Sequence, residues 1–176
     1  MPGSAAAADG ESTSALPPQG LYEGCAPGAP GPACAARLAE IRSAGFRVVL
    51  NYSAWYGSPA EVLAYADQAA ALGLQLIWPL NHPAWRGLVG FPNTYPRLTG
   101  DHETLGEADS AARAIALVAD HPATWGFYIG DELPPWEAGR VAALGALVRA
   151  LAPERPLLRS ARATRSSAPR RAPPGR

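Results

Sequence analysis

The sequence predicts an α/β fold with parallel strands, and two observations carry this prediction. Apolar stretches that favour strands alternate with stretches of helical periodicity at intervals of about 30 residues, as expected of βα units. Two of these helix–strand pairs also repeat each other, because each ends in the pattern Asn-x-x-Ala-Trp, at residues 51–55 and 81–85. With 176 residues and a hydrophobic content of 48%, the chain is long enough for one domain with a buried core.

Each predicted strand is a short run of apolar, β-branched or aromatic residues. The first run, GLYEG, is followed by the more strongly apolar runs FRVVLNYSAW, LQLIWPLNHPAW and TWGFYIGDE. A long loop at residues 86–106 separates the third strand from the helix that precedes the fourth. The four predicted strands span residues 20–24, 46–55, 74–85 and 124–132.

Helices are predicted between the strands from the spacing of apolar residues and from signals at the helix ends. The first and second helices end at Gly45 and Gly73. The second begins with Ser58 as its N-cap and Pro59 at its first position, and Pro135 lies near the start of the fourth. The four predicted helices span residues 33–45, 58–73, 107–123 and 135–154.

The net charge of zero combines two portions of opposite charge. Residues 1–154 contain all 15 acidic residues and 8 of the 15 arginines, a net charge of −7, whereas residues 155–176 contain the other 7 arginines and no acid. Neither end of the chain has apolar periodicity, so segments 1–19 and 159–176 are predicted to be disordered. The predicted folded domain is therefore residues 20–158.

The basic segment 159–176 has two interpretations. A fifth strand is due near residues 155–160 and begins plausibly at 155–158, but the composition changes abruptly from about Arg159, so we interpret the segment as out-of-frame translation of DNA that once encoded more of the fold. The alternative is a basic tail that contacts nucleic acid or an acidic surface. Nucleic acid is the less favoured partner, because the segment has no aromatic residue to stack on bases.

Composition and motifs exclude several kinds of site. No apolar run is long enough to cross a bilayer, and the N-terminus lacks a signal peptide, so the chain is expected to be cytoplasmic at face value, or secreted if its start is truncated. No metal or other cofactor is expected, because the three histidines lack ligand spacing and there is no glycine-rich phosphate loop. Cys25 and Cys34 flank a Gly/Pro loop, and both a disulfide and two free thiols remain open.

Polar and aromatic residues follow the predicted strands at the edge where parallel α/β folds gather their functional groups. Asp131 and Glu132 end the fourth strand side by side and are the candidate catalytic residues. Aromatic rings beside amides and carboxylates suit a carbohydrate, because rings stack on sugar C–H faces and polar groups bind hydroxyls. The alternative is that the rings cap the core and the asparagines end strands. The candidate substrate-binding residues are Glu23, Asn51, Tyr52, Trp55, Asn81, His82 and Trp85.

The segment HPATWGFYIGDELPP resembles the fourth-strand segment of bacterial (β/α)8-barrel glycoside hydrolases. The segments GLYEG, AGFRVVLNYSAW and LGLQLIWPLNHPAW are similar to strands one to three of such barrels, so the resemblance covers about residues 20–154. It implies a partial (β/α)8 TIM barrel of about four βα units. It also implies that Glu132 is the general acid/base, although Asp131 stands where the family usually has Asn. The alternative is that this acidic pair caps the following helix.

The resemblance implies a glycoside-hydrolase-like domain that is truncated and does not hydrolyse its substrate. A complete barrel has eight βα units, and retaining hydrolysis needs a second carboxylate about 5 Å from the first, which the family supplies from strand seven. A half barrel exposes strand edges and apolar side chains, so self-association is expected.

The four strands are predicted to lie in sequence order, with Glu132 in one cleft with Asn51, Asn81 and Trp85. The alternatives are a non-catalytic carbohydrate-binding or scaffold domain, and a different parallel α/β fold in which Asp131 and Glu132 hold a cation.

Overall fold

A parallel sheet of five strands in the order β1-β2-β3-β6-β7 forms the centre of the protein, and β4 and β5 form a separate antiparallel pair. The computed structural model describes residues 19–29, 34–84, 87–90, 96–99, 107–130 and 134–159. The strands of the parallel sheet are β1 (Gly20–Glu23), β2 (Val48–Asn51), β3 (Gln75–Pro79), β6 (Thr124–Tyr128) and β7 (Leu157–Leu158). The antiparallel pair is β4 (Asn81–Ala84) and β5 (Gly87–Gly90).

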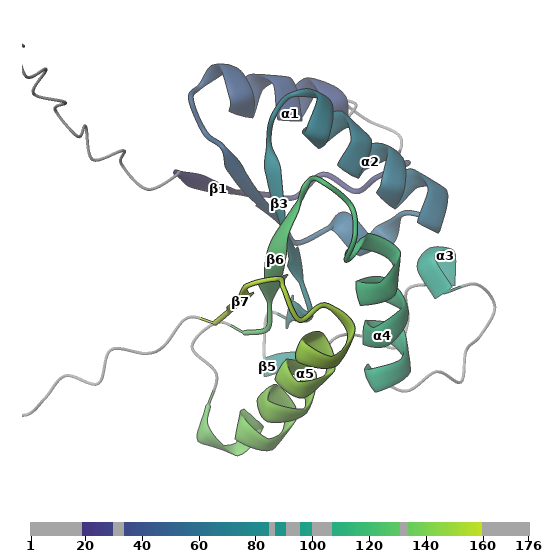
Figure 1. Cartoon of the computed structure of the whole chain (residues 1–176), viewed down its shortest axis with the longest axis vertical. Helices are drawn as coiled ribbons and strands as arrows, with labels where there is room; N and C mark the ends of the chain where they lie inside the picture. Colours follow the sequence, from purple (N-terminus) through teal and green to yellow (C-terminus); the bar gives the residue numbers. More distant parts are fainter. Residues whose placement is uncertain are drawn as a thin grey trace, which may run out of the picture.

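The four longer helices lie on one side of the parallel sheet (Figure 1). This follows from the strand order, because right-handed crossovers between strands that follow one another in sequence all pass over the same face. The opposite face is here called the helix-free face. The four helices are α1 (Cys34–Ser43), α2 (Pro59–Ala71), α4 (Glu107–Val118) and α5 (Ala138–Leu151). The shorter ones are η1 (Ala54–Tyr56), α3 (Pro96–Thr99) and η2 (Pro135–Glu137).

Helix α2 begins and ends as its sequence predicts. The Ser58 hydroxyl accepts a hydrogen bond from the Glu61 backbone N–H (3.4 Å), and the Glu61 carboxylate accepts one from the Ser58 backbone N–H (2.7 Å). This reciprocal capping satisfies two N–H groups that the first turn leaves without partners. After the helix, Gly73 has a φ of +66°, which only glycine adopts without strain.

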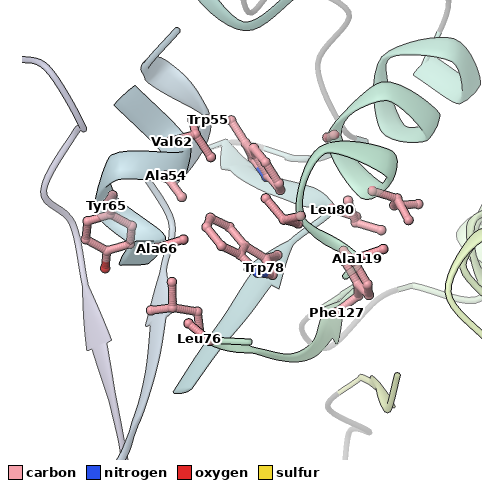
Figure 2. Packing of buried hydrophobic residues seen from close by; sticks show 14 of the residues in the cluster. Ala54, Trp55, Val62, Tyr65, Ala66, Leu76, Trp78, Leu80, Ala119 and Phe127 are labelled. Carbon is pink, nitrogen blue, oxygen red and sulfur yellow. The ribbon is translucent and has the colours of Figure 1, made fainter. Parts of the chain in front are cut away.

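The hydrophobic core lies between the parallel sheet and the helices, and Trp78 of β3 is at its centre (Figure 2). The rings of Trp55 and Trp78 pack together with their centroids 5.0 Å apart. The indole N–H of Trp78 donates to the Thr124 hydroxyl (2.9 Å), which donates in turn to the Val118 carbonyl (2.6 Å). The core therefore links β3, β6 and α4 through a buried polar chain as well as through apolar contacts.

The predicted order of the four strands is confirmed, and all of them are parallel. A fifth strand, β7, lies within residues 155–160, where the sequence predicts its start, and it pairs with Phe127 and Tyr128 of β6. Gly126 permits this pairing, because a Cβ atom there would lie 2.3 Å from the Pro156 carbonyl oxygen.

Three predicted strands are longer by several residues than the strands in the structure, and one of them, predicted at 124–132, ends at Tyr128. The strand predicted at residues 46–55 ends at Asn51, and η1 follows it. The strand predicted at 74–85 leaves the parallel sheet after Pro79 and turns at Leu80 into the β4–β5 hairpin. Within the described residues, no helix has the length and apolar character needed to cross a membrane. The segments predicted to be disordered, 1–19 and 159–176, lie outside the described residues except for Gln19 and Arg159.

Candidate functional site

Glu23 lies at the carboxyl end of β1 and supports the loop that follows this strand. One carboxylate oxygen accepts hydrogen bonds from the backbone N–H groups of Gly24 (2.8 Å) and Cys25 (3.1 Å). The other lies 3.3 Å from the Arg37 guanidinium of α1, and the Glu23 side chain is 5% exposed. The carboxylate is thus occupied by loop backbone and a helix side chain, so it acts as a positioning group.

Asn51, at the carboxyl end of β2, lies beside Glu23 in the register of the sheet. Its amide NH₂ donates to the Cys25 carbonyl (2.8 Å), and its amide oxygen accepts from the Ser53 N–H (2.8 Å). The residue is 2% exposed. Asn51 therefore holds the turn after β2 against the loop after β1, and both predicted binding residues, Glu23 and Asn51, have structural partners.

The tyrosine cluster, formed by Tyr22, Tyr52 and Tyr128, lies at the same end of the sheet. The rings of Tyr22 and Tyr52 are stacked, with centroids 5.6 Å apart, and Tyr52 meets Tyr128 edge to face at 6.3 Å. Successive side chains of a strand point to opposite faces, so Tyr22 lies on the face opposite Glu23. Tyr22 is 64% exposed, whereas Tyr128 is buried. The cluster therefore presents an accessible aromatic surface on the helix-free face.

An apolar pocket of about 190 Å³ adjoins the tyrosine cluster on the helix-free face. It shares Tyr22 and Tyr128 with the cluster and extends across strands of the sheet toward β7. Its floor is buried, since Leu50 is only 6% exposed. The lining residues are Gly20, Leu21, Tyr22, Leu50, Ile77, Tyr128 and Leu158.

Trp55 lies in the core, and this corrects its predicted place at a binding surface. It is fully buried, and its indole N–H donates to the Pro79 carbonyl at 2.5 Å (Figure 2). The short helix η1 causes this placement, because it turns the chain after Asn51 and directs Ala54 and Trp55 into the core. The ring faces of Trp55 are thus packed against protein and not available to a ligand.

The remaining predicted site residues belong to two other parts of the chain. Asn81 and His82 lie in β4, where they pair with Gly90 and Val89 of β5, outside the parallel sheet. Trp85, Asp131 and Glu132 lie outside the described residues. The predicted cleft that joins Glu132 to Asn51, Asn81 and Trp85 therefore stays a prediction.

Tyr65 of α2 places a buried hydroxyl group near the ends of β1 and β2. Burial raises the pKa of Tyr65 well above its ordinary value, and the Glu23 charge raises it further, whereas the Asn51 amide lowers it. The residue is 2% exposed. Tyr65 therefore stays protonated at neutral pH.

Sequence reasoning missed Tyr22, Tyr128 and Tyr65. A signal existed for the first two, because the period of two along a strand separates Tyr22 from Glu23 and Tyr128 from Phe127. Tyr65 lies on the apolar stripe of α2 with Val62, so its pattern is that of an ordinary core residue.

Cys25 and Cys34 form a disulfide with their Cα atoms 5.7 Å apart, which settles the alternative that the sequence left open. Among the described residues, no group of three or more His, Cys, Asp or Glu side chains is placed to hold a metal ion. Comparison with known proteins found no match, either to a family model or to a curated protein.

Proposed function

We propose that this chain is a glycoside-hydrolase-like domain that binds carbohydrate on the helix-free face of its sheet, at the carboxyl ends of the strands. Parallel strands in sequence order with helices on one side are what part of a (β/α)8 barrel would have, and the helix-free face would then be its inner face. The observation that carries the proposal is the tyrosine cluster at this edge.

The tyrosine cluster has the properties that sugar binding requires. An aromatic ring packs on the C–H face of a pyranose, and a phenol hydroxyl can donate or accept a hydrogen bond with a sugar hydroxyl. Tyr22 is 64% exposed, and its stacking on Tyr52 fixes its orientation before any ligand binds. A ring held in place in this way loses little conformational freedom on binding.

We further propose that the chain binds sugars without hydrolysing them. Glu132 follows Tyr128 by four positions and is the candidate acid, with Asp131 beside it. Retaining hydrolysis needs a second carboxylate about 5 Å away. The described carboxylate at the strand ends, Glu23, lies on the opposite face and is paired with Arg37. A non-catalytic carbohydrate-binding domain is therefore the form of the proposal that the geometry favours.

Self-association is the second part of this proposal. The outer strands of the parallel sheet are β1 and β7, and each pairs with one neighbour within the described residues. Such edges, next to an apolar face, favour pairing with a second copy. Sedimentation velocity over a range of protein concentrations tests this, and a monomer at every concentration would contradict it.

The test of carbohydrate binding is calorimetric titration with cellotetraose, xylotetraose, mannotetraose and chitotetraose. We expect at least one tetraose to bind, and Tyr22→Ala to weaken its binding about tenfold, a change of about 1.4 kcal/mol. Tyr56→Ala is the matched control, because Tyr56 is an exposed tyrosine of η1 outside the cluster. The absence of binding by all four sugars, or equal effects of both substitutions, would contradict the proposal.

A further inference from the structure

We propose that the Cys25–Cys34 disulfide is a redox-sensitive brace for the tyrosine cluster, so that reduction by a dithiol weakens carbohydrate binding. The disulfide joins the loop after β1 to the first residue of α1. The effect on binding rests on the proposed function. The effect of the disulfide on the structure of the two strand ends is independent of the proposed function. It is measured separately.

Cys25 is the point at which the disulfide is connected to the strand ends. Its N–H donates to the Glu23 carboxylate (3.1 Å), and its carbonyl accepts from the Asn51 amide (2.8 Å). The same amide nitrogen lies 3.6 Å from the Cys25 sulfur. A change in the position of Cys25 therefore disturbs the two buried polar side chains that end β1 and β2.

These two side chains lie next to the backbone that carries Tyr52. The Asn51 amide oxygen accepts from the Ser53 N–H (2.8 Å), and the Tyr52 N–H donates to the Glu23 carbonyl (3.1 Å). The hydrogen bonds thus fix the backbone on both sides of Tyr52, whose ring stacks on Tyr22. Movement of Cys25 is transmitted to the aromatic surface through one layer of hydrogen bonds.

The disulfide is the covalent tie between the loop after β1 and α1, and it acts beside non-covalent contacts such as the buried Pro27. Residues 24–29 form no helix or strand, and the segment contains Gly28 with a φ of +72°. A disulfide across a sequence separation of nine residues restricts such a loop strongly. Without it, non-covalent contacts alone hold the loop, among them the hydrogen bonds of Cys25 with Glu23 and Asn51.

The geometry also points to the order of the reduction steps. Both cysteines are only partly buried, so a small thiolate can reach their sulfur atoms. Attack on the Cys25 sulfur breaks the S–S bond, and the bonding electron pair leaves on the Cys34 sulfur. The first-turn N–H groups of α1 stabilise that thiolate, and the first turn has no acidic side chain.

The second thiol of the reagent then completes the reduction. It attacks the reagent sulfur of the mixed disulfide and releases Cys25 as a thiolate. Overall, two electrons and two protons pass from the dithiol to the cysteine pair, and the reagent becomes a cyclic disulfide.

The experiment compares oxidised and dithiothreitol-treated protein. We expect reduction to weaken binding of the best tetraose at least fivefold and to speed amide hydrogen exchange of Cys25, Tyr52 and Ser53 about tenfold. The control is the double variant Cys25→Ser/Cys34→Ser, which should resemble the reduced protein and ignore dithiothreitol. With limiting glutathione, peptide mapping should find the mixed disulfide on Cys25.

The outcomes separate this proposal from the proposed function. Equal sugar affinity before and after reduction would overturn the redox control while the carbohydrate site stands. If no sugar binds, the proposed function fails, and unchanged hydrogen exchange would overturn the brace as well. If the double variant does not fold, the comparison of oxidised and reduced wild type still tests the redox control. Circular dichroism then shows whether both forms of the wild type are folded.

Discussion

The rings of Tyr22 and Tyr52 are parallel to within 7° and 5.6 Å apart, although the two residues are 30 positions apart in the chain. Their contact is a consequence of register, because Glu23 and Asn51, the residues next to them, are paired across β1 and β2. The aromatic surface on the helix-free face is thus set by the same pairing that places two buried polar side chains on the other face.

The ring of Tyr22, more than its hydroxyl, is expected to carry sugar binding. Tyr22→Phe keeps the stack on Tyr52 and should change the tetraose affinity less than threefold, whereas Tyr22→Ala should lower it about tenfold. Calorimetry on both variants gives the comparison. Equal losses in the two would mean that the hydroxyl, and not the ring face, makes the contact.

Hydrolysis by this chain is not expected. Nitrophenyl glycosides of glucose, xylose, mannose and N-acetylglucosamine should release nitrophenol no faster than they do in buffer. The reason is that an acid alone does not supply the group that attacks the sugar. Release measured on wild type and on Glu132→Gln tests this. Turnover by wild type that disappears in the variant would show that a second catalytic group is present.

Loss of the Asn51 side chain is expected to destabilise the fold. Asn51→Ala leaves the Cys25 carbonyl and the Ser53 N–H, which make partly buried hydrogen bonds, without their partner. A fully buried group of this kind costs about 1–3 kcal/mol, and a partly buried one costs less. Urea unfolding of the oxidised protein should show a free energy of unfolding lower by about 2–4 kcal/mol. Gln75→Ala, at an exposed position of β3, is the control and should change stability little. If Asn51→Ala lowered the free energy of unfolding no more than Gln75→Ala does, water would be shown to replace both hydrogen bonds.

The start of α2 is expected to weaken in acid. Hydrogen bonds from Ser58, with help from Arg97, hold the pKa of Glu61 below its ordinary value of 4.5. A lowered pKa in the folded state means that the carboxylate stabilises the fold fully above pH 4.5. This contribution is lost as the pH falls below 4.5 and through the folded pKa.

Thermal unfolding of wild type and Glu61→Gln between about pH 3 and pH 6 tests the acid weakening of α2. The wild-type Tm should fall more steeply below pH 4.5, because the variant has no carboxyl group to protonate at this position. Parallel curves for the two proteins would contradict the assignment.

The sequence predicts the fold more completely than it predicts the site. The periodic spacing of hydrophobic residues, and residues that mark helix ends such as Ser58 and Gly73, depend only on neighbouring sequence. They are therefore enough to locate the four βα units. The turn at Leu80 does not have a local cause. The pairing of β3 with β6 ends at Pro79 and Tyr128, and the apolar run of β3 does not show where that pairing ends.

The sequence assigned the candidate residues to the carboxyl ends of the strands but did not determine which face of the sheet they occupy. The sequence shows that Tyr22 and Glu23 point in opposite directions, but the packing of α1 decides which of them meets Arg37 and which meets solvent. Trp55 shows the same limit, because the bend at η1 that sends it into the core depends on the space beside Trp78.

The sequence order of the strands also has a consequence for biosynthesis. Each strand of the parallel sheet after β1 pairs with one that was made before it, so it finds a partner as soon as it is made. A ribosome that makes this chain would release a β1–β2 pair first, and every later βα unit would dock on an edge that already exists. Each pairing nevertheless joins residues that are far apart in the chain, such as Gly20 and Val48 or Ile77 and Gly126, so the earlier strand of each pair must wait for the helix between it and its partner to be made. The growing edge of the sheet stays unpaired during that time, which is when a parallel sheet is most exposed to aggregation.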